Sequence, residues 1–275
     1  MVSHALVEGL RHLGLASLVS DGASEPAIGT AILYAQITLG RPTIGVDDTE
    51  LEQVLRQTMA RDLAAPERGL VVRGYVRAAN GAPLANLRVQ VFDRDLRHAE
   101  LLGTTTTDGQ GRYELAYEAS QFVRSEKPRA DLVVHAARDM GPLLRSPIEF
   151  DAPVVAIINL AAGPLERITE WTLVSRAIMP VLDGVAPPEL TDDDLAFLIR
   201  EAKHPREAIE AWVHAHRFAS ALGVDAMAVY GCLRQRIPAD PERFAAQPAA
   251  RIRAALADSA AEDVIAPLDL SLIHI

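Results

Sequence analysis

The spacing of apolar residues changes twice along this chain, and that change limits the folds it can adopt. Near the start, Leu6, Leu10 and Leu13 recur at the spacing of one helix face. From about residue 69 the spacing becomes two, as in half-buried strands, and from about residue 164 the helical spacing returns. We therefore predict a multidomain α and β protein, with a helical domain over 1–68, a β-sandwich over 69–163 and a helical bundle over 164–269.

Three helices are expected in the N-terminal domain. A loop rich in Ser, Asp and Gly is predicted over Ser20–Gly29, and a second helix follows over Ile32–Leu39. The side chains of Asp47-Asp48-Thr49 predict the start of a third helix, because such groups accept hydrogen bonds from the amides of a first turn. The apolar face of this helix is predicted at Leu51, Val54, Leu55 and Met59.

Six short strands are expected in the middle domain. The turn signals Asn80-Gly81 and Asp108–Gly111 separate apolar runs, because Gly and Asn tolerate the positive φ of tight turns. Short strands at regular spacing joined by such turns favour a sandwich of two sheets. The predicted strands are Val71–Val76, Leu87–Phe92, Leu101–Thr107, Arg112–Tyr117, Ala130–Ala136 and Val154–Leu160.

Helical boundaries are well marked in the C-terminal domain. Thr191 is expected to cap a helix whose first turn holds Asp192, Asp193 and Asp194, where the helix dipole favours acids. One apolar stripe is predicted at Trp171, Val174, Ile178 and Val181. Further boundaries are predicted at Pro205, Gly223 and Asp225, and a last helix over Ala249–Ala260.

Charge and composition exclude several classes of protein. The net charge of -10 opposes binding to phosphate backbones, so we expect no nucleic acid partner. A single cysteine, Cys232, excludes an internal disulfide, and we interpret it as a buried side chain. The sequence has neither an export signal nor an apolar run long enough for a membrane span. We expect a soluble protein of cytoplasmic synthesis, and leave open its release from the cell.

Four motifs in the middle domain resemble the carboxypeptidase regulatory-like domain, a β-sandwich of the transthyretin-like or prealbumin-like type. The resemblance implies a module without catalytic residues of its own. The motifs are Gly74-Tyr75-Val76, Asn80-Gly81-Ala82-Pro83-Leu84, Val89-Gln90-Val91 and Thr107-Asp108-Gly109-Gln110-Gly111-Arg112-Tyr113.

A longer resemblance covers roughly residues 70–265. The segments Val91–Arg97 with Glu100–Gly103, Leu190–Leu198 and Val229–Gln235 are similar to segments in the A subunit of bacterial insecticidal toxin complexes. This resemblance implies that the chain is a fragment of a larger toxin-complex-like protein. Its expected partners are therefore other domains or subunits of an assembly.

Both ends of the chain carry further resemblances. Gly45-Val46-Asp47, with Gln36 and Gly40 before it, is similar to a helical peptidoglycan-binding domain, although Ala35 stands where that family has an aromatic residue. Cell-wall glycan is therefore a second candidate partner. The last six residues, Leu270–Ile275, resemble translated sequencing-adapter sequence, which predicts that they are an artefact.

Metal-ligating side chains are present but poorly spaced. His214 and His216 lie two apart, so a helix directs them to different faces, and we interpret His216 as a satisfied core or interface residue. His204 with Glu201 and Glu207 could converge, but a solvated helix end explains them equally well. The acids Asp93, Asp95 and Asp108 could hold calcium, yet we interpret them as strand-edge and turn residues, and Asp192–Asp194 as capping residues.

Two groups of enzymes share the transthyretin-like fold, and each has characteristic site residues. The terminal Tyr-Arg-Gly-Ser of hydroxyisourate hydrolases is missing. Intradiol dioxygenases place two Tyr and two His on iron, whereas Tyr113, Tyr117 and His135 here lack a second His at suitable spacing. We therefore interpret both tyrosines as core strand residues.

The predicted function is that of a structural or interaction module, and not of an enzyme. We assign no catalytic, cofactor-binding or metal-binding residue and expect no cofactor. A carbohydrate- or peptidoglycan-binding module is the first alternative, although Trp171 and Trp212 lie on core stripes rather than on an exposed platform. A metal-dependent hydrolase that uses His204 or His214 is the second.

Overall fold

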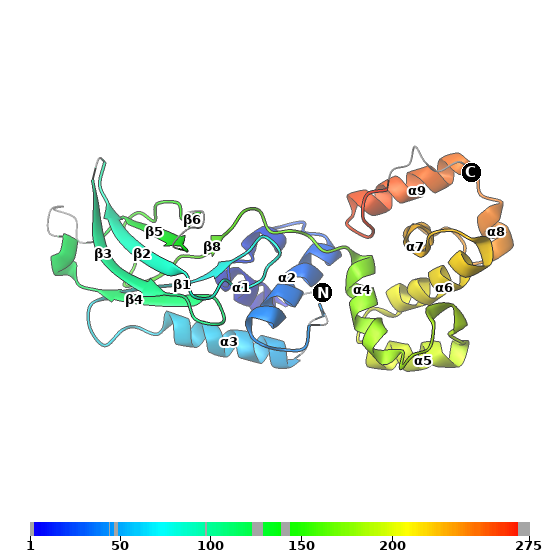
Figure 1. Ribbon diagram of the computed structural model, residues 1–275, viewed down its shortest axis with the longest axis horizontal. Coiled ribbons are helices and arrows are strands. Elements are labelled where there is room, and N and C mark those ends of the chain that lie inside the picture. Colours follow the sequence, from blue (N-terminus) through cyan, green and yellow to red (C-terminus); the bar gives the residue numbers. More distant parts are fainter. Residues whose placement is uncertain are drawn as a thin grey trace. The chain divides into compact units, whose positions relative to one another are not determined.

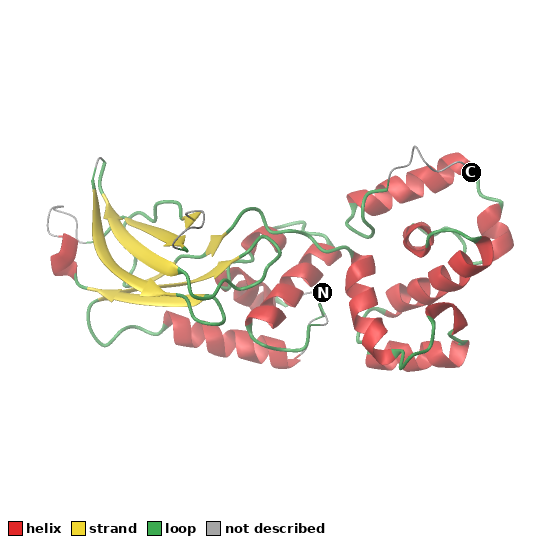
Figure 2. Cartoon of the chain, in the orientation of Figure 1, coloured by secondary structure: helices red, strands yellow, loops and turns green. Residues whose placement is uncertain are grey.

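The computed structural model of the chain describes residues 3–43, 45–46, 49–96, 98–122, 129–138 and 144–268. It divides into a β-containing unit (Met1–Ser20, Tyr34–Thr43 and Asp47–Glu166) and a helical unit (Asp21–Leu33, Ile44–Val46 and Arg167–Ile275). Helices precede and follow the strands, so the predicted mixed α and β class is confirmed (Figures 1 and 2). The three-domain boundaries stay predictions. The predictions for Asp47, Asp48, Arg97 and 270–275 fall outside the described residues.

The N-terminal helices are α1 (His4–His12), α2 (Glu25–Thr38) and α3 (Thr49–Leu63). The predicted apolar face of α1 is confirmed by the burial of Leu6, Leu10 and Leu13. The loop predicted over Ser20–Gly29 is wrong in its second half, because α2 begins at Glu25. Ser24 Oγ accepts from the amide of Ala27 at 3.3 Å, and the first turn of a helix tolerates the proline that follows Glu25.

Two sheets form the strand region of the β-containing unit (Figure 2). In the first, β1 (Leu70–Arg77) lies between β4 (Arg112–Tyr117) and β7 (Val155–Ile157), and β8 (Leu160–Ala161) also pairs with β1. The order of the second is β3 (Ala99–Thr106), β2 (Arg88–Arg94), β5 (Leu132–Ala137) and β6 (Leu144–Arg145). Strand β6 was not predicted.

Both sheets contribute to a single hydrophobic core. Val72 and Tyr113 point into it from the first sheet, and Val89, Val91 and Val134 from the second. The alternation of buried and partly exposed residues in β2 follows from the period of two in its sequence. The intervening residues therefore point away from the core on both sheets.

The strand predicted over Val154–Leu160 is interrupted, so this prediction is wrong in its continuity. The break falls at Ile158 and Asn159, between β7 and β8. Asn159 Oδ1 accepts from the amide of Tyr75 at 2.8 Å, and its Nδ2 donates to the carbonyl of His12 at 3.0 Å. The asparagine side chain thus takes the place of a backbone partner of β1, which the pattern of apolar residues could not reveal.

Close packing at the break explains why residue 74 of β1 is a glycine. A Cβ atom on Gly74 would lie 1.9 Å from the carbonyl oxygen of Ile158. We predict that Gly74→Ala forces β1 and β7 apart and lowers the free energy of unfolding by about 1–3 kcal/mol. Urea unfolding followed by amide hydrogen exchange would measure this loss, and Gly109→Ala is the control, since a Cβ there meets nothing within 4 Å. Equal stability of the two variants would contradict the prediction.

Six α-helices are described in the C-terminal part of the helical unit, and several of their predicted ends are confirmed. They are α4 (Glu170–Ile178), α5 (Asp192–Glu201), α6 (Arg206–Leu222), α7 (Ala226–Arg234), α8 (Pro241–Ala245) and α9 (Ala249–Ala261). Thr191 and Asp194 form a capping box at the start of α5, and Gly223 ends α6 with a φ of 67°. Asp225 caps α7, whereas α8 was not predicted.

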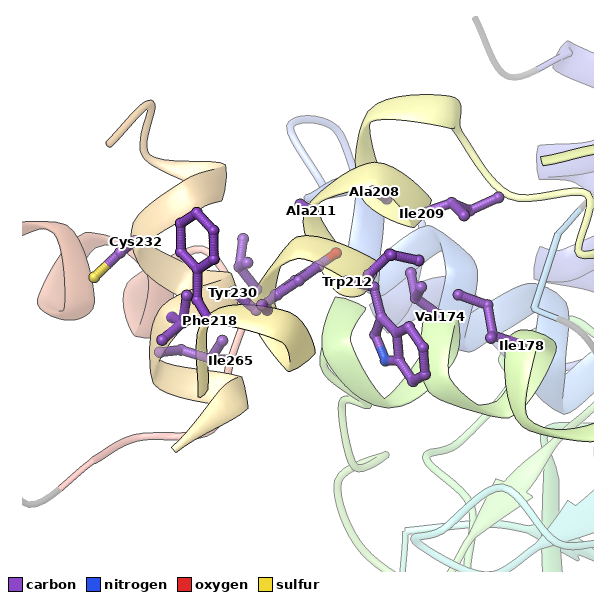
Figure 3. Close-up of a cluster of buried hydrophobic side chains, with 14 of the residues drawn as sticks. Val174, Ile178, Ala208, Ile209, Ala211, Trp212, Phe218, Tyr230, Cys232 and Ile265 are labelled. Carbon is purple, nitrogen blue, oxygen red and sulfur yellow. The ribbon is translucent and has the colours of Figure 1, made fainter. Parts of the chain in front are cut away.

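The core of the helical unit is built around α6 and α7. Trp212 and Tyr230 are fully buried there, and they pack with Val174 and Ile178 of α4 and Ile265 (Figure 3). Among the described residues, the helices are too short or too polar to span a bilayer.

Candidate functional site

A buried carboxylate organises the polar groups between α3 and the first sheet. Asp62, in the last turn of α3, is 1% exposed and accepts four hydrogen bonds. The donors are His12 Nε2 at 3.1 Å, Arg61 Nε at 3.0 Å, Tyr75 Oη at 2.7 Å and Arg112 Nε at 2.9 Å. We call these five residues the Asp62 network.

The hydrogen bonds and burial of the Asp62 network shift the pKa values of Asp62 and Tyr75. Burial alone would raise the pKa of Asp62, but the four donors outweigh burial and hold that pKa well below its usual range. Burial and the bond to Asp62 raise the pKa of Tyr75 above its usual range. The carboxylate of Asp62 and the phenol of Tyr75 are thus bound to each other, and the network joins α1 and α3 to β1 and β4.

Two further arginines of β1 tie the same sheet to the N-terminal helices. Arg73 donates at 2.7 Å to the carbonyl oxygens of Asp62 and Ala64, at the end of α3. Arg77 is 1% exposed and donates to Thr38 Oγ1 at 2.9 Å and to the carbonyl of Leu13 at 2.5 Å. Burial lowers the pKa of Arg77 to about 10. The polar side of the first sheet is thus occupied by intramolecular contacts.

The predicted tyrosines and cysteine are core residues. Tyr113 is 1% exposed and donates to the carbonyl of Ile158 at 2.6 Å, and Tyr117 is also buried in the shared core. Burial raises the pKa of Tyr117 to about 12 and that of Cys232 to about 11. Their interpretation as buried packing residues is confirmed.

The candidate metal ligands do not come together. Within the described part of the chain, no three His, Cys, Asp or Glu side chains form a group suited to a metal ion. Asp108 Oδ1 accepts from the amides of Gln110 and Arg112, which confirms its role as a turn residue. Asp93 accepts from the amide of Asp131 at 2.9 Å.

The structure of His216 differs in one respect from the interpretation based on the sequence. His216 packs against Trp212 with ring centroids 4.2 Å apart and against Trp171 at 5.2 Å. Its Nε2 atom is buried and has no hydrogen-bond partner in the described residues, so the expected satisfied histidine is wrong in that respect. Burial lowers the pKa of His216, and the neutral ring is stabilised by aromatic packing.

The second sheet presents a different surface on the side away from the core. Cross-strand pairing places Phe92 of β2 between Leu101 of β3 and Val133 of β5, so these apolar side chains form a row across three strands. Leu101 is 47% exposed. Pairing assigns to this side Arg88, Gln90, Phe92, Arg94, Ala99, Leu101, Thr104, Thr106, Val133, His135, Ala137 and Arg145, which we call the Phe92 face.

A β-bulge completes the apolar row. Between the pairs of Val91 with Gly103 and Phe92 with Leu101, the extra residue Leu102 has no partner on β2. Leu102 is buried in the core, and Leu101 beside it lies on the Phe92 face. Without the bulge, leucine at 101 would lie on the core side of the sheet.

The charge of the Phe92 face is opposite to that of the whole chain. It carries Arg88, Arg94 and Arg145, whereas the chain has a net charge of -10. The carboxylate of Asp131, just before β5, is buried and accepts from the amide of Asp151. His135 lies 4.8 Å from the ring of Phe92, and its Nε2 has no hydrogen-bond partner among the described residues. Burial and the charge of Arg145 lower the pKa of His135, so the ring is neutral near pH 7.

Each unit contains a cavity among its described residues. A cavity of about 180 Å³ in the β-containing unit is lined by Leu84, Leu87, Ala136, Ala137, Arg138, Leu144 and Ala162. In the helical unit, a cavity of about 420 Å³ is lined by Glu207, Ala211, Leu233, Arg234, Gln235, Arg236, Glu262 and Val264. Polar groups in the larger one are partly paired, since Arg234 binds Glu170 and Gln235 binds Glu262.

Comparison with known proteins assigns no family. No family model matches the chain, and no curated protein matches it. A search of solved structures finds a 9R-lipoxygenase from Cyanothece PCC8801 at 13% identity and a TM-score of 0.25, covering 86% of this chain and 33% of that chain. The chain thus spans about a third of the length of that lipoxygenase, and a likeness of this size supports no functional argument.

Proposed function

We propose that this chain is a non-catalytic interaction module in which the Phe92 face binds an acidic protein segment that also carries apolar side chains. The observation that carries the proposal is the composition of that face. The exposed Leu101 and the partly exposed Phe92, flanked by arginines, complement a partner of the opposite charge, whereas Val133 beside them is buried.

The sequence motifs indicate the kind of larger protein to which this module belongs. Gly74–Val76 and Thr107–Tyr113 resemble the carboxypeptidase regulatory-like, prealbumin-like β-sandwich, and two sheets around one core are compatible with it. The toxin-complex-like segments then favour a partner that belongs to a larger assembly. A segment of another domain or subunit is the partner class we propose.

The absence of a catalytic role is also part of the proposal. Tyr75 and Arg112 on the first sheet are bound to Asp62, which accepts from four donors in all. A carboxylate that accepts four hydrogen bonds positions helices on strands and has no lone pair left for a substrate.

A protein partner is favoured over nucleic acid. Single-stranded nucleic acid is bound by several stacking aromatics in a positive groove, whereas the Phe92 face offers one phenylalanine and one neutral histidine among aliphatic and hydroxyl side chains. The net charge of -10 also repels a polyphosphate over long range.

The proposal predicts charge-dependent binding of a defined peptide. A blocked peptide of alternating glutamate and leucine should bind the full chain, with affinity that falls as salt rises. The double variant Arg88→Glu/Arg145→Glu should bind about tenfold more weakly, because two attractive charges become repulsive. Isothermal titration calorimetry measures both.

A matched control separates the face from overall charge. Arg56→Glu/Arg68→Glu makes the same change of charge on the same unit, outside the Phe92 face, and should bind within about twofold of the parent chain. Equal weakening in both double variants would contradict the proposal. So would tighter binding of oligothymidylate or of soluble cell-wall glycan than of the peptide.

A further inference from the structure

The cavity of about 180 Å³ lies at one end of the two-sheet core. Leu87 directly precedes β2, Leu144 begins β6, and Ala137 ends β5. Ala162, on the opposite sheet, donates its amide to the carbonyl of Arg77 at 2.9 Å. The cavity, which we call the Leu84 pocket, therefore opens where the ends of both sheets meet.

The Leu84 pocket has apolar walls and a single basic residue in its lining. Its lining is aliphatic except for Arg138, which is exposed and makes no ion pair within the described part of the chain. Arg88 and Arg145 follow the lining residues Leu87 and Leu144 but lie on the Phe92 face, on the other side of the sheet. Arg88 also pairs across the strands with the lining residue Ala137.

Volume limits what the Leu84 pocket can accept. Sites for drug-sized ligands enclose about 300–1,000 Å³, so this pocket is suited to one side chain rather than to a whole cofactor. Apolar walls favour a branched aliphatic group, because burial of such a group from water is the main source of affinity there. Arg138 in the lining favours a carboxylate close to that group.

We infer that the Leu84 pocket takes one leucine- or isoleucine-sized side chain of the docked acidic segment, with a neighbouring carboxylate bound by Arg138. The inference rests on the proposed function and names the anchor of that interaction. Interfaces commonly depend on a few side chains that fill desolvated pockets, surrounded by contacts that contribute less. The pocket supplies such an anchor point at the end of the Phe92 face, where Ala137 both lines the pocket and pairs with Arg88.

The experiment uses 4-methylpentanoate, which combines an isobutyl group with a carboxylate. Methyl resonances of Leu84, Leu87 and Leu144 should shift saturably when it is titrated into the full chain. The neutral 4-methylpentanamide should bind about three- to fivefold more weakly, as expected for loss of one exposed ion pair. Arg138→Gln should reduce binding of the acid to the level of the amide, whereas the control Arg68→Gln should not.

The outcomes separate this inference from the proposed function. If the glutamate–leucine peptide binds the Phe92 face but neither the peptide nor the acid shifts the three leucine methyls, the pocket inference is overturned and the docking face stands. If the acid shifts the methyls and the peptide does not bind, the proposed function fails. Equal binding of acid and amide would remove Arg138 from the inference.

Discussion

Replacing Asp62 by alanine is expected to lower the free energy of unfolding of the β-containing unit by about 3–5 kcal/mol, as for other buried ion pairs that lose one partner. The carboxylate is 1% exposed, and its removal leaves donors of His12, Tyr75 and Arg112 without an acceptor. Unpaired buried donors keep their full desolvation cost. Asp62→Asn keeps the shape and one acceptor oxygen, so its loss should be smaller.

The two units can be followed separately in this experiment. Both tryptophans lie in the helical unit, so their fluorescence reports on that unit, and amide hydrogen exchange of β1 and β4 reports on the other. Asp62→Ala should shift the exchange of the strands in urea and leave the tryptophan transition unchanged. A loss below about 1 kcal/mol would mean that the network contributes little.

Stability of the same unit should fall in acid. The pKa of Asp62 is depressed in the folded chain, whereas an unfolded aspartate titrates near about 3.9. The contribution of Asp62 is therefore complete above about pH 4 and is lost as the pH falls towards the folded pKa. Urea midpoints of the parent chain and of Asp62→Ala should converge between pH 5 and pH 2, values chosen to bracket this range. A constant difference between them would contradict the assigned pKa direction.

Replacing Trp212 by alanine is expected to remove about 3–5 kcal/mol from the stability of the helical unit. The indole is 1% exposed, packs against Trp171 and His216, and donates from Nε1 to Ser175 Oγ at 2.9 Å (Figure 3). Its removal leaves a cavity in a closely packed core. Fluorescence of the remaining Trp171 in urea measures the change.

A matched substitution distinguishes loss of volume from general disturbance. Trp212→Phe retains most of the aromatic packing and should cost clearly less than alanine. Phe197→Ala, at a position that is 47% exposed on α5, should change stability by less than about 0.5 kcal/mol. If Trp212→Ala and Phe197→Ala unfold at the same urea concentration, the core assignment is wrong.

Local rules predicted the elements whose signals lie close together in sequence. The capping box of Thr191 and Asp194 and the left-handed Gly223 follow from side chains three residues apart and from one glycine. The start of α2 was not predicted, although the Ser24 cap is equally local, because the Ser, Asp and Gly of that segment are also typical of a loop.

Contacts between distant segments could not be predicted in this way. The alternation in β1 shows that Arg73, Tyr75 and Arg77 share one side of a strand, and a polar side is normally expected to face solvent. That side instead meets Asp62, which no local pattern connects with β1. The break at Asn159 has the same origin, since its partners belong to β1 and to the end of α1.

The Phe92 face could be predicted only in part from the sequence. The period of two directs Phe92 and Val91 to different sides of β2, so the outward direction of Phe92 follows from the sequence. Its neighbours Leu101 and Val133 follow only from the register, and the register of β3 depends on the bulge at Leu102. The Leu84 pocket is formed by the ends of both sheets, and it was not predicted.

The central claim is that the Phe92 face is the binding surface of this chain. The most direct test is amide and methyl chemical-shift mapping of the full chain on addition of the blocked glutamate–leucine peptide. We predict that the largest shifts fall on Phe92, Leu101 and His135, with little change in β1, β4 or the helical unit. Shifts confined to the Asp62 network or to the helical unit, with the Phe92 face unchanged, would contradict the account.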